Sequence, residues 1–525
     1  MFSMANTLPL ERCADVVLLG NLGDVLRTAG YTGEGFRDAL AVEGGARRDR
    51  ADIQFHLRRL PDDDRLSTLI KLFWLGVPIS SNEAAAALAP LPLHGLEELG
   101  VLTLVEDSVE ATLEIFPTGG LLVAGDRLGA SRSFGPPDQV IGVMPSSLAL
   151  MRLTPRRDVD SVLDLGTGSG VQALCAARHA RKVVAVDVNP RALEYTELNV
   201  ALNGITNVEC RVGDILDLPD GPDFDLVLCN PPYVISPDTS FTLRDGGLAG
   251  DSFCERLVRH VPGYVKEGGL AAVLVGWIVR DADWMAPLRS WVEGSGCDAL
   301  LLHFVTQDPL TYAADWNEGL RSDEDAYAGA LDRWLDYYRE LEIEALAWGV
   351  VVLRRRSGAN WVWAHDYASS DRMQSAGEQV LRLFEAQDYL RSLPDDRALL
   401  EARLALVDEH LLTREVQFRD GAEVVGRQIL NLEQGFGFRV GVDVYTAELL
   451  PHFDGRRPLG EILEEAVDGM PGHIDRAEFR AGALRVVRRL VEAGFLAAGR
   501  AQHDAEGERV ENRRTAAPQA NARGG

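Results

Sequence analysis

From about residue 135 onward, two hydrophobic patterns alternate along the chain. Short apolar runs typical of buried strands are followed by longer segments whose apolar residues recur at helical spacing. The strand-like runs are SVLDLG, KVVAVDV, VECRVGD, DLVLCN and GGLAAVLVGW, and the helical ones include VQALCAARHA and PRALEYTELNVALNG. This order predicts an α/β fold in which helices cover a largely parallel sheet.

The same region extends to about residue 368. DALLLHFVT and ALAWGVVVLRRR are two further predicted strands, and NWVWAHD follows a Ser-Gly turn as the predicted hairpin partner of the second. The polar, aromatic-rich residues 306–345 lie between strands, which predicts an insertion over one face of the sheet. Its aromatic residues could stack on bases or on a peptide, but at helical spacing they are more typical of a core.

The length of 525 residues predicts several domains, because it exceeds what one ordinary hydrophobic core supports. Residues 65–125 combine short helical patterns with strand-like runs, which predicts a helical, winged-helix-like module within residues 1–130. A second module of this kind is predicted at residues 369–500, after the α/β region at 131–368. Residues 501–525 are polar and aperiodic, which predicts a disordered tail.

Composition predicts a soluble, cytoplasmic protein, with 46% hydrophobic and 25% charged residues. We find no signal-peptide pattern, and the longest apolar stretch, LAAVLVGWIV, is half as long as a membrane span. Six cysteines without a CxxC pair argue against a metal site.

The net charge of −27 opposes nonspecific binding to nucleic acid, so any such contact needs local basic clusters. Solvated helix faces are the more common role of such clusters. The candidates are Arg47, Arg48, Arg50, Arg58, Arg59, Arg485, Arg488 and Arg489.

The segment VLDLGTGSG places an acid at the end of a predicted strand and three glycines before a helix. Glycine tolerates positive φ and close backbone approach, so a ligand can lie directly on this turn. The dinucleotide pattern GxGxxG fails, because Val171 occupies its last position. The acid also suits a ligand with a cationic amino group better than one with a pyrophosphate. The candidate cofactor-binding residues of this segment are Asp164, Gly166, Thr167, Gly168 and Gly170.

Two further acids end the next two predicted strands. Asp187, followed by Val188, lies about 20 residues beyond the glycines, where an acid accepts hydrogen bonds from ribose hydroxyls. Asp214, followed by Ile215, can accept from an adenine amino group. Because the carboxyl ends of parallel strands meet at one edge, we expect all these groups to share one ligand. An adenosine carrying an α-amino acid would use all of them, so the sequence predicts S-adenosylmethionine as cofactor.

The strand DLVLC runs directly into Asn230-Pro231-Pro232-Tyr233. The two prolines lack a backbone N–H and fix φ, so the strand must end at Asn230. An isolated motif of this kind is most often a plain strand-terminating turn. After the glycine-rich turn and the two acids, however, it predicts a rigid platform beside the cofactor.

These motifs, in this order, resemble those of class I S-adenosylmethionine-dependent methyltransferases, whose cores are Rossmann-like. The resemblance covers about residues 140 to 280 and is to the branch with an [N/D]PP[Y/F/W] motif, which methylates planar nitrogen. It is nearest to the release-factor glutamine methyltransferases and the small-domain RNA guanine methyltransferases. The segment LRDGGLAGDSFCERLVRHVPGYVKEGG also resembles the glycine-rich segment and helix that follow this motif in the glutamine enzymes.

The resemblance implies catalytic roles for Asn230, Pro231, Pro232 and Tyr233. The side-chain oxygen of Asn230 and the carbonyl of Pro231 would accept the two hydrogens of the substrate NH2 group. Tyr233 would stack on the flat substrate group. Such bonding directs the nitrogen lone pair toward the sulfonium methyl, and the proton can leave after transfer.

The sequence leaves the substrate open. Modules on both sides of the core favour a macromolecule, with an adenine or guanine amine of DNA or RNA as first expectation and a protein glutamine as second. A small-molecule methyltransferase and a DNA-binding sensor of S-adenosylmethionine are further readings. The intact NPPY segment argues against a sensor, which has no need of paired acceptors.

Two nearby segments have plain structural interpretations. Cys229 precedes the motif, but no Pro-Cys loop accompanies it, so a small buried strand residue is the better interpretation. GVMPSSLAL at residues 142–150 resembles the segment that caps the methionine moiety in this family, and it is nearly as typical of a serine-capped helix start.

Overall fold

The computed structural model describes residues 15–40, 53–62, 64–127, 135–218, 221, 223–367, 373–419, 421–469 and 475–498. The chain divides into two compact units, Met1–Ser370 and Asp371–Gly525. Three residues of the first basic cluster (Arg47, Arg48 and Arg50) and the predicted tail at 501–525 lie outside the described residues. Among the described helices, none has the length and hydrophobicity that crossing a membrane requires.

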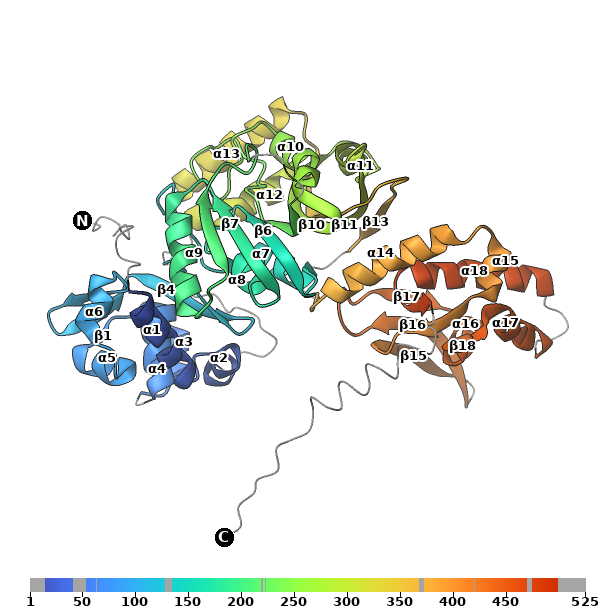
Figure 1. The fold of residues 1–525 in the computed structure, drawn as a ribbon, viewed down its shortest axis with the longest axis horizontal. Coiled ribbons are helices and arrows are strands. Elements are labelled where there is room, and N and C mark those ends of the chain that lie inside the picture. Colours follow the sequence, from blue (N-terminus) through green and yellow to red (C-terminus); the bar gives the residue numbers. More distant parts are fainter. Residues whose placement is uncertain are drawn as a thin grey trace, which may run out of the picture. The chain divides into compact units, whose positions relative to one another are not determined.

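The first unit contains an eight-stranded sheet (Figure 1). In order across the sheet, the strands are β13 (Val362–Asp366), β11 (Cys297–Gln307), β12 (Ala345–Arg355), β10 (Val265–Val279), β9 (Phe224–Cys229), β6 (Val159–Leu165), β7 (Ala180–Asp187) and β8 (Val208–Val212). The five strands from β10 to β8 are mutually parallel, as the alternating pattern predicts. Residues 183–186 of β7 are all buried, so both faces of this strand are covered.

The strand order reverses between β6 and β9, because β7 and β8 extend the sheet to one side of β6 while β9 and β10 extend it to the other. In open α/β sheets, such a reversal leaves a crevice outside the carboxyl ends of the strands. The glycine-rich turn follows β6 and Asn230 follows β9, so both lie at this crevice. The core is therefore a Rossmann-like α/β sheet of the predicted class.

The predicted hairpin between residues 345–356 and 360–366 is wrong. Strand β12 is antiparallel to both β10 and β11, so both of its hydrogen-bonding edges are occupied. Strand β13 instead crosses β11 and pairs with its outer edge in parallel. A Ser-Gly turn signals a change of direction, but it does not identify the strand that receives the returning chain.

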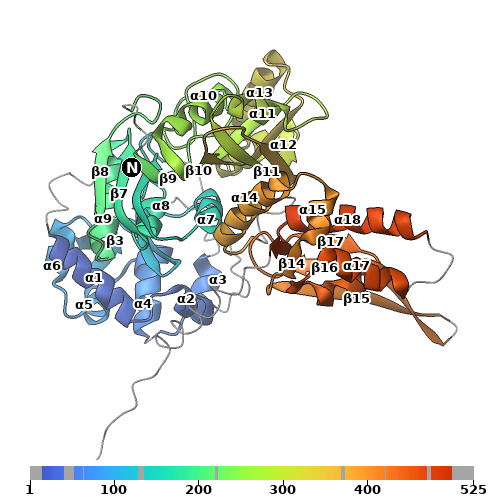
Figure 2. The same ribbon diagram turned by 45° about the vertical axis from the view of Figure 1, so that its right-hand side comes forward.

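Helices cover the sheet (Figure 2). They are α7 (Pro145–Leu153), α8 (Val171–Ala176), α9 (Pro190–Leu202), α10 (Ser252–His260), α11 (Ala286–Val292), α12 (Pro309–Trp316) and α13 (Glu324–Glu340). Helices α10 and α11 share a buried cluster with Leu163, Val184 and Val227 of the central strands. Helices α12 and α13 form the predicted insertion between β11 and β12.

An N-terminal module precedes the core. Its elements are α1 (Val16–Thr28), α2 (Gly33–Leu40), α3 (Ile53–Arg59), α4 (Arg65–Ile70) with a wider turn at Lys71–Leu75, β1 (Ile79–Ser80), α5 (Ser81–Leu88), α6 (Leu93–Glu98), β2 (Leu102–Val105) and β3 (Ser108–Ala111). The three strands form an antiparallel sheet in the order β1-β3-β2. A capping box between Ser80 and Glu83 starts α5. The assignment of the N-terminal module to the winged-helix class stays a prediction.

The N-terminal module shares its hydrophobic core with α9. Helix α1 lies directly against α9, and a Cβ atom at Gly23 would stand 2.0 Å from the carbonyl oxygen of Leu202. Glycine at this position thus permits the close approach of the two helices. Arg27 stabilises the same contact by donating hydrogen bonds to the carbonyl of Leu202 at 3.2 Å and to Asn203 Oδ1 at 2.9 Å.

A hairpin of β4 (Leu113–Thr118) and β5 (Leu121–Asp126) connects the module to the core. Asn199 of α9 is fully buried, and its amide exchanges hydrogen bonds with the backbone N–H and C=O of Ala124 at 2.7 and 2.9 Å. The same amide donates to the carbonyl of Ser169 at 2.9 Å. One side chain therefore joins the hairpin to the glycine-rich turn.

The second unit contains two antiparallel three-stranded sheets, in the orders β18-β14-β19 and β15-β16-β17. Its elements are α14 (Gly377–Ser392), α15 (Asp396–Glu401), β14 (Arg403–Leu406), β15 (His410–Arg419), β16 (Ala422–Leu432), β17 (Arg439–Val442), α16 (Val444–Leu449), β18 (Asp454–Pro458), α17 (Leu459–Asp468), α18 (Arg476–Glu492) and β19 (Leu496–Ala498). The β15–β16 hairpin was not predicted, although the Asp-Gly pair at 420–421 is typical of a tight hairpin turn.

Candidate active site

A cavity of about 290 Å³ lies at the carboxyl ends of β6, β7, β8 and β9. Two of the predicted site residues, Asp164 and Gly170, lie outside its lining. The others line it: Gly166, Thr167, Gly168, Asp187, Val188, Asp214, Ile215, Asn230, Pro231, Pro232 and Tyr233. The fold thus brings groups from four strands to one hollow at the reversal of strand order.

The glycine-rich turn leaves open space over its backbone. Gly166 and Gly168 have φ angles of 67° and 57°, and a Cβ atom built on either meets no other atom within 4 Å. A ligand can therefore lie directly against the main chain there. Gly170 has a different role, since its Cβ would stand 2.9 Å from the side chain of Thr196. It permits close packing of the turn against α9.

Asp164 stabilises this turn from the side away from the cavity. It is 1% exposed, and its Oδ2 accepts from Thr167 Oγ1 at 2.6 Å and from the backbone N–H of Ala173 at 3.0 Å. Burial raises the pKa of this carboxyl to about 7, although both hydrogen bonds oppose the shift. The carboxyl thus joins the turn to α8, whereas the sequence analysis assigned it to a cationic amino group of the ligand.

Asp187 lies at the edge of the cavity and is 9% exposed. Its two oxygens accept from the backbone N–H groups of Gly168 and Asn189, both at 2.9 Å. Burial raises its pKa, with these bonds opposing the rise. Each carboxylate oxygen can still accept another hydrogen bond, as ribose hydroxyls would require.

An apolar surface and a second acid continue the cavity beyond Asp187. The Val188 side chain is 56% exposed at the lining, and Ile215 is buried there. Asp214 accepts from the backbone N–H of Leu216 at 2.9 Å. Two aliphatic side chains beside an acceptor form a surface suited to a flat heterocycle with an exocyclic amine.

Asn230 is held in place by two hydroxyl groups of α7. Its Nδ2 lies 3.2 Å from Ser146 Oγ and 3.3 Å from Ser147 Oγ. With the amide nitrogen engaged by both serines, the side-chain oxygen remains an acceptor for another group. From the sequence, the segment of these serines was interpreted as a cap on the methionine moiety or as a serine-capped helix start, and their contact with Asn230 was not predicted.

Tyr233 is enclosed by aromatic residues. Its ring is nearly parallel to that of Trp348 at a centroid distance of 6.3 Å, and it meets the ring of Trp316 edge-on at 6.4 Å. Burial raises the pKa of the phenol to about 12, although a hydrogen bond with Ser146 acts to lower it. Trp316 of the insertion also lines the cavity. The wall of the site is therefore flat and apolar next to the acceptors of the Asn-Pro-Pro segment.

The insertion fixes the loop that follows Tyr233. Asp238 accepts from Trp334 Nε1 at 3.0 Å, from Arg333 Nε at 3.1 Å and from Arg244 at 3.3 Å. Trp334 is fully buried. Two tyrosines of the same helices, Tyr312 and Tyr338, are buried as well and bond to the backbone of Ile235. The core interpretation of these three aromatic residues is confirmed, and only Trp316 faces the cavity.

Cys229 is fully buried at the end of β9, and burial raises the pKa of its thiol. It does not line the cavity. The structure thus agrees with its interpretation as a small strand residue.

These groups fit S-adenosylmethionine. The open backbone at Gly166 and Gly168 provides room for it, the carboxylate of Asp187 suits its ribose, and Asp214 suits its adenine amine. When bound, the cofactor supplies a methyl group on a sulfonium centre. Asn230 lies in the same cavity and offers an oxygen acceptor for the group that receives it.

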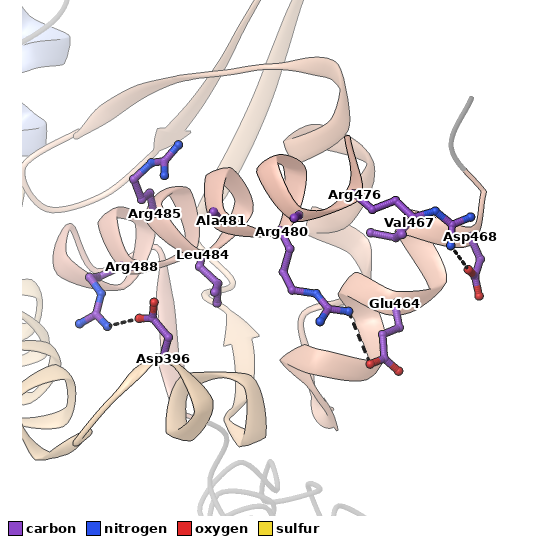
Figure 3. Close-up of a pocket in the computed structure, with 11 residues that line it drawn as sticks. Asp396, Glu464, Val467, Asp468, Arg476, Arg480, Ala481, Leu484, Arg485 and Arg488 are labelled. Carbon is purple, nitrogen blue, oxygen red and sulfur yellow. Dashed lines mark hydrogen bonds and ion pairs between the residues drawn. The ribbon is translucent and has the colours of Figure 1, made fainter. Parts of the chain in front are cut away.

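The second unit has a separate groove of about 730 Å³ between α17 and α18 (Figure 3). Three of its four arginines are paired with acids: Arg476 with Asp468 at 3.5 Å, Arg480 with Glu464 at 3.6 Å, and Arg488 with Asp396 at 3.1 Å. Arg485 is the fourth. Of the predicted basic cluster, Arg485 and Arg488 line this groove, and Arg488 is paired with an acid.

Two family models match the first unit. Residues 143–269 match the methyltransferase small domain, and residues 28–112 match a domain of unknown function, DUF7059. The first match covers the glycine-rich turn, the acids Asp164, Asp187 and Asp214, and the Asn-Pro-Pro-Tyr segment. The second match lies within the N-terminal module.

Three curated relatives are similar to the core. A "Putative protein N5-glutamine methyltransferase" of Methanocaldococcus jannaschii is 34% identical over 152 residues, which are 27% of this chain and 75% of that protein. A release factor glutamine methyltransferase of Koribacter versatilis is 34% identical over 147 residues, 25% of this chain and 52% of that protein. A ribosomal protein uL3 glutamine methyltransferase of Bordetella pertussis is 28% identical over 195 residues, 34% of this chain and 65% of that protein. The chain thus spans three quarters of the first relative and about half to two thirds of the others.

Proposed function

The chain belongs to the S-adenosylmethionine-dependent N-methyltransferases with a methyltransferase small domain, and we propose that its substrate is the side-chain amide of a glutamine in a protein. The names of the relatives support this choice over a nucleic-acid base, since all three refer to glutamine methylation. It is the second of the two macromolecular substrates considered from the sequence.

The anchored amide of Asn230 is the observation that carries the proposal. Ser146 and Ser147 hold its nitrogen, so its oxygen can accept one hydrogen of a primary amide. In the proposed mechanism the backbone carbonyl of Pro231, which follows β9 and lines the same cavity, accepts the other. A glutamine amide has two such hydrogens and a lone pair delocalised into its carbonyl. Two rigid acceptors favour a geometry in which that lone pair is available.

The aromatic wall of the cavity, formed by Tyr233 and Trp316, is suited to a small planar substrate group. Tyr233 and Trp316 meet edge to face, and the insertion behind them is packed as a core. A planar amide on a flexible side chain needs only this short apolar surface beside the acceptors. The proton on the nitrogen can leave after methyl transfer, so the site needs no general base.

Charge supports protein over nucleic acid as the macromolecule. The chain carries a net charge of −27, and the arginines of the groove in the second unit are mostly paired with acids. The net charge repels a polyanion at long range, and in the described groove three of the four arginines already face acids. We propose that the terminal modules contact the protein substrate.

The test uses acid cleavage of the bond between the methylated nitrogen and the glutamine carbonyl. Full-length protein is incubated with methyl-labelled S-adenosylmethionine and a lysate from a strain that lacks the gene, with Asn230→Ala as control. Acid hydrolysis of a methylated glutamine amide releases labelled methylamine and leaves unlabelled glutamate. We expect protease-sensitive label that is released as volatile methylamine, absent with the control variant.

The other outcomes select other functions. Nuclease-sensitive label would refute the proposal in favour of a nucleic-acid base. Protease-sensitive label that resists conversion to methylamine would indicate a different side chain. Label in metabolites alone would indicate a small-molecule substrate, and the absence of any transfer would favour a sensor.

A further inference from the structure

Gln172 is a buried polar residue that the proposed mechanism leaves without a role. It lies on the first turn of α8, is 4% exposed and lines the cavity. Its Nε2 donates to the backbone carbonyl of Ser147 at 2.8 Å. Because a carbonyl can only accept, this bond fixes which end of the amide is the nitrogen.

The other end of this amide is unsatisfied. Gln172 Oε1 is buried and has no hydrogen-bond donor among the residues that the structure describes. A buried acceptor without a donor is costly, and the great majority of such atoms in proteins are bonded. Because Gln172 lines a ligand cavity, a donor on the ligand is the candidate partner for this acceptor.

The remaining donor of the cofactor is its α-ammonium group. Asp187 serves the ribose hydroxyls and Asp214 the adenine amine in the assignment above. Asp164, the acid that the sequence assigns to the ammonium, is outside the lining and already accepts from Thr167 and Ala173. Gln172, in contrast, lines the cavity beside the glycine-rich turn with a free acceptor.

We propose that Gln172 Oε1 accepts a hydrogen bond from the α-ammonium group of S-adenosylmethionine, and that the same side chain positions Asn230 through Ser147. The second part follows from two consecutive contacts. Gln172 holds the backbone carbonyl of Ser147, and the hydroxyl of Ser147 lies 3.3 Å from Asn230 Nδ2. The ammonium contact involves the cofactor alone, whereas the positioning of Asn230 rests on the proposed function.

A ligand pair tests the ammonium contact. Affinities for S-adenosylhomocysteine and for its analogue without the α-amino group are measured by calorimetry on the full chain, with and without Gln172→Leu. A hydrogen bond to a charged group corresponds to roughly a tenfold or larger change in affinity. We expect Gln172→Leu to lose that factor for S-adenosylhomocysteine and to bind the deaminated analogue like the wild type.

The deaminated ligand also reports folding of the variant site. Gln387→Leu, a buried glutamine of the second unit, is the matched control and should leave both affinities unchanged. Equal weakening of both ligands by Gln172→Leu, or no change in either, would overturn the ammonium contact.

Gln172→Glu tests the positioning part. A carboxylate keeps the acceptor for the ammonium but cannot donate to the carbonyl of Ser147. We expect it to bind S-adenosylhomocysteine more tightly than Gln172→Leu does, with single-turnover methyl transfer at saturating cofactor reduced at least about fivefold. Binding no tighter than that of Gln172→Leu would count against the ammonium contact, and wild-type transfer would refute the link to Asn230.

Discussion

Asn230 and Ser147 are 83 positions apart in the chain, yet Nδ2 of the first lies 3.3 Å from Oγ of the second. One follows the strand β9 and the other starts the helix α7, so the contact exists only in the folded core. It engages the nitrogen end of the Asn230 amide, and in the proposed mechanism the oxygen end accepts from the substrate.

Replacing Asn230 by alanine should lower kcat by about 100-fold or more, since the oxygen proposed to accept from the substrate NH2 group is lost. Affinity for S-adenosylhomocysteine should remain within about threefold of the wild type, because Asp187 and the glycine-rich turn are untouched. Single-turnover transfer and calorimetry check the two parts. Equal loss of transfer and cofactor binding would contradict the proposed role.

Removing both hydroxyls with Ser146→Ala and Ser147→Ala should lower kcat by about tenfold, because the Asn230 amide can then rotate. Each single variant should lose less, since one hydroxyl remains. Ser392→Ala in the second unit is the control. A double variant with wild-type kcat would show that the serines do not position Asn230.

The variant Asp187→Ala should weaken binding of S-adenosylhomocysteine by roughly 10- to 100-fold, because the charge-assisted hydrogen bonds proposed to join this carboxylate to the ribose are lost. Calorimetry measures the dissociation constant. Asp217→Ala removes a nearby exposed carboxylate and should have no effect. If both variants bind the ligand like the wild type, the ribose assignment is wrong.

The buried carboxyl of Asp164 should make the free energy of unfolding fall with rising pH between about 4 and 7. Its pKa is about 7 in the folded chain, against an ordinary value of 3.8. In this window the folded state keeps a proton that the unfolded state has lost, so stability falls by up to about 1.4 kcal/mol per pH unit and levels off above pH 7.

Urea unfolding of the wild type and of Asp164→Asn at pH 5, 6, 7 and 8 checks this prediction. The variant carries no titrating group there, so its stability relative to the wild type should rise from pH 5 to pH 7. Stability curves that run parallel over the whole range would contradict the raised pKa.

Two glycines of α1 should respond oppositely to alanine. A Cβ at Gly23 would clash with the carbonyl of Leu202 at 2.0 Å, whereas one at Gly20 would lie an ordinary 3.7 Å from the carbonyl of Ala201. Gly23→Ala should therefore lower the free energy of unfolding by about 2 kcal/mol. Gly20→Ala should be neutral or up to about 1 kcal/mol more stable. Thermal unfolding compares them, and equal melting temperatures would refute the close contact.

The residues found from the sequence lie at strand ends, where a local pattern also fixes a place in space. Gly166, Asp187 and Asn230 each follow a predicted strand, and parallel strands deliver their ends to one edge. This is why one cavity contains nearly all the predicted residues. It is also why the Rossmann-like class was predictable without the order of every strand.

The residues that sequence analysis missed owe their role to packing between distant segments. Gln172 follows the glycine-rich turn, where its helical position gives no sign that its amide reaches the carbonyl of Ser147. The hydroxyls of Ser146 and Ser147 look like a helix cap until α7 is placed beside β9. For Asp164, the strand position was predicted correctly, but the direction of its side chain depends on Thr167 and Ala173.

The amide of Asn199 has a consequence for how this protein can be divided. It joins Ala124 of the β4–β5 hairpin to Ser169 of the glycine-rich turn, while the match to the methyltransferase small domain begins at residue 143. A fragment that starts there would leave this amide with unpaired groups and would expose the apolar surface of α9. The smallest fragment that keeps these contacts therefore has to begin upstream of residue 143, with α1 included. Truncation libraries and domain grafts should start from that point.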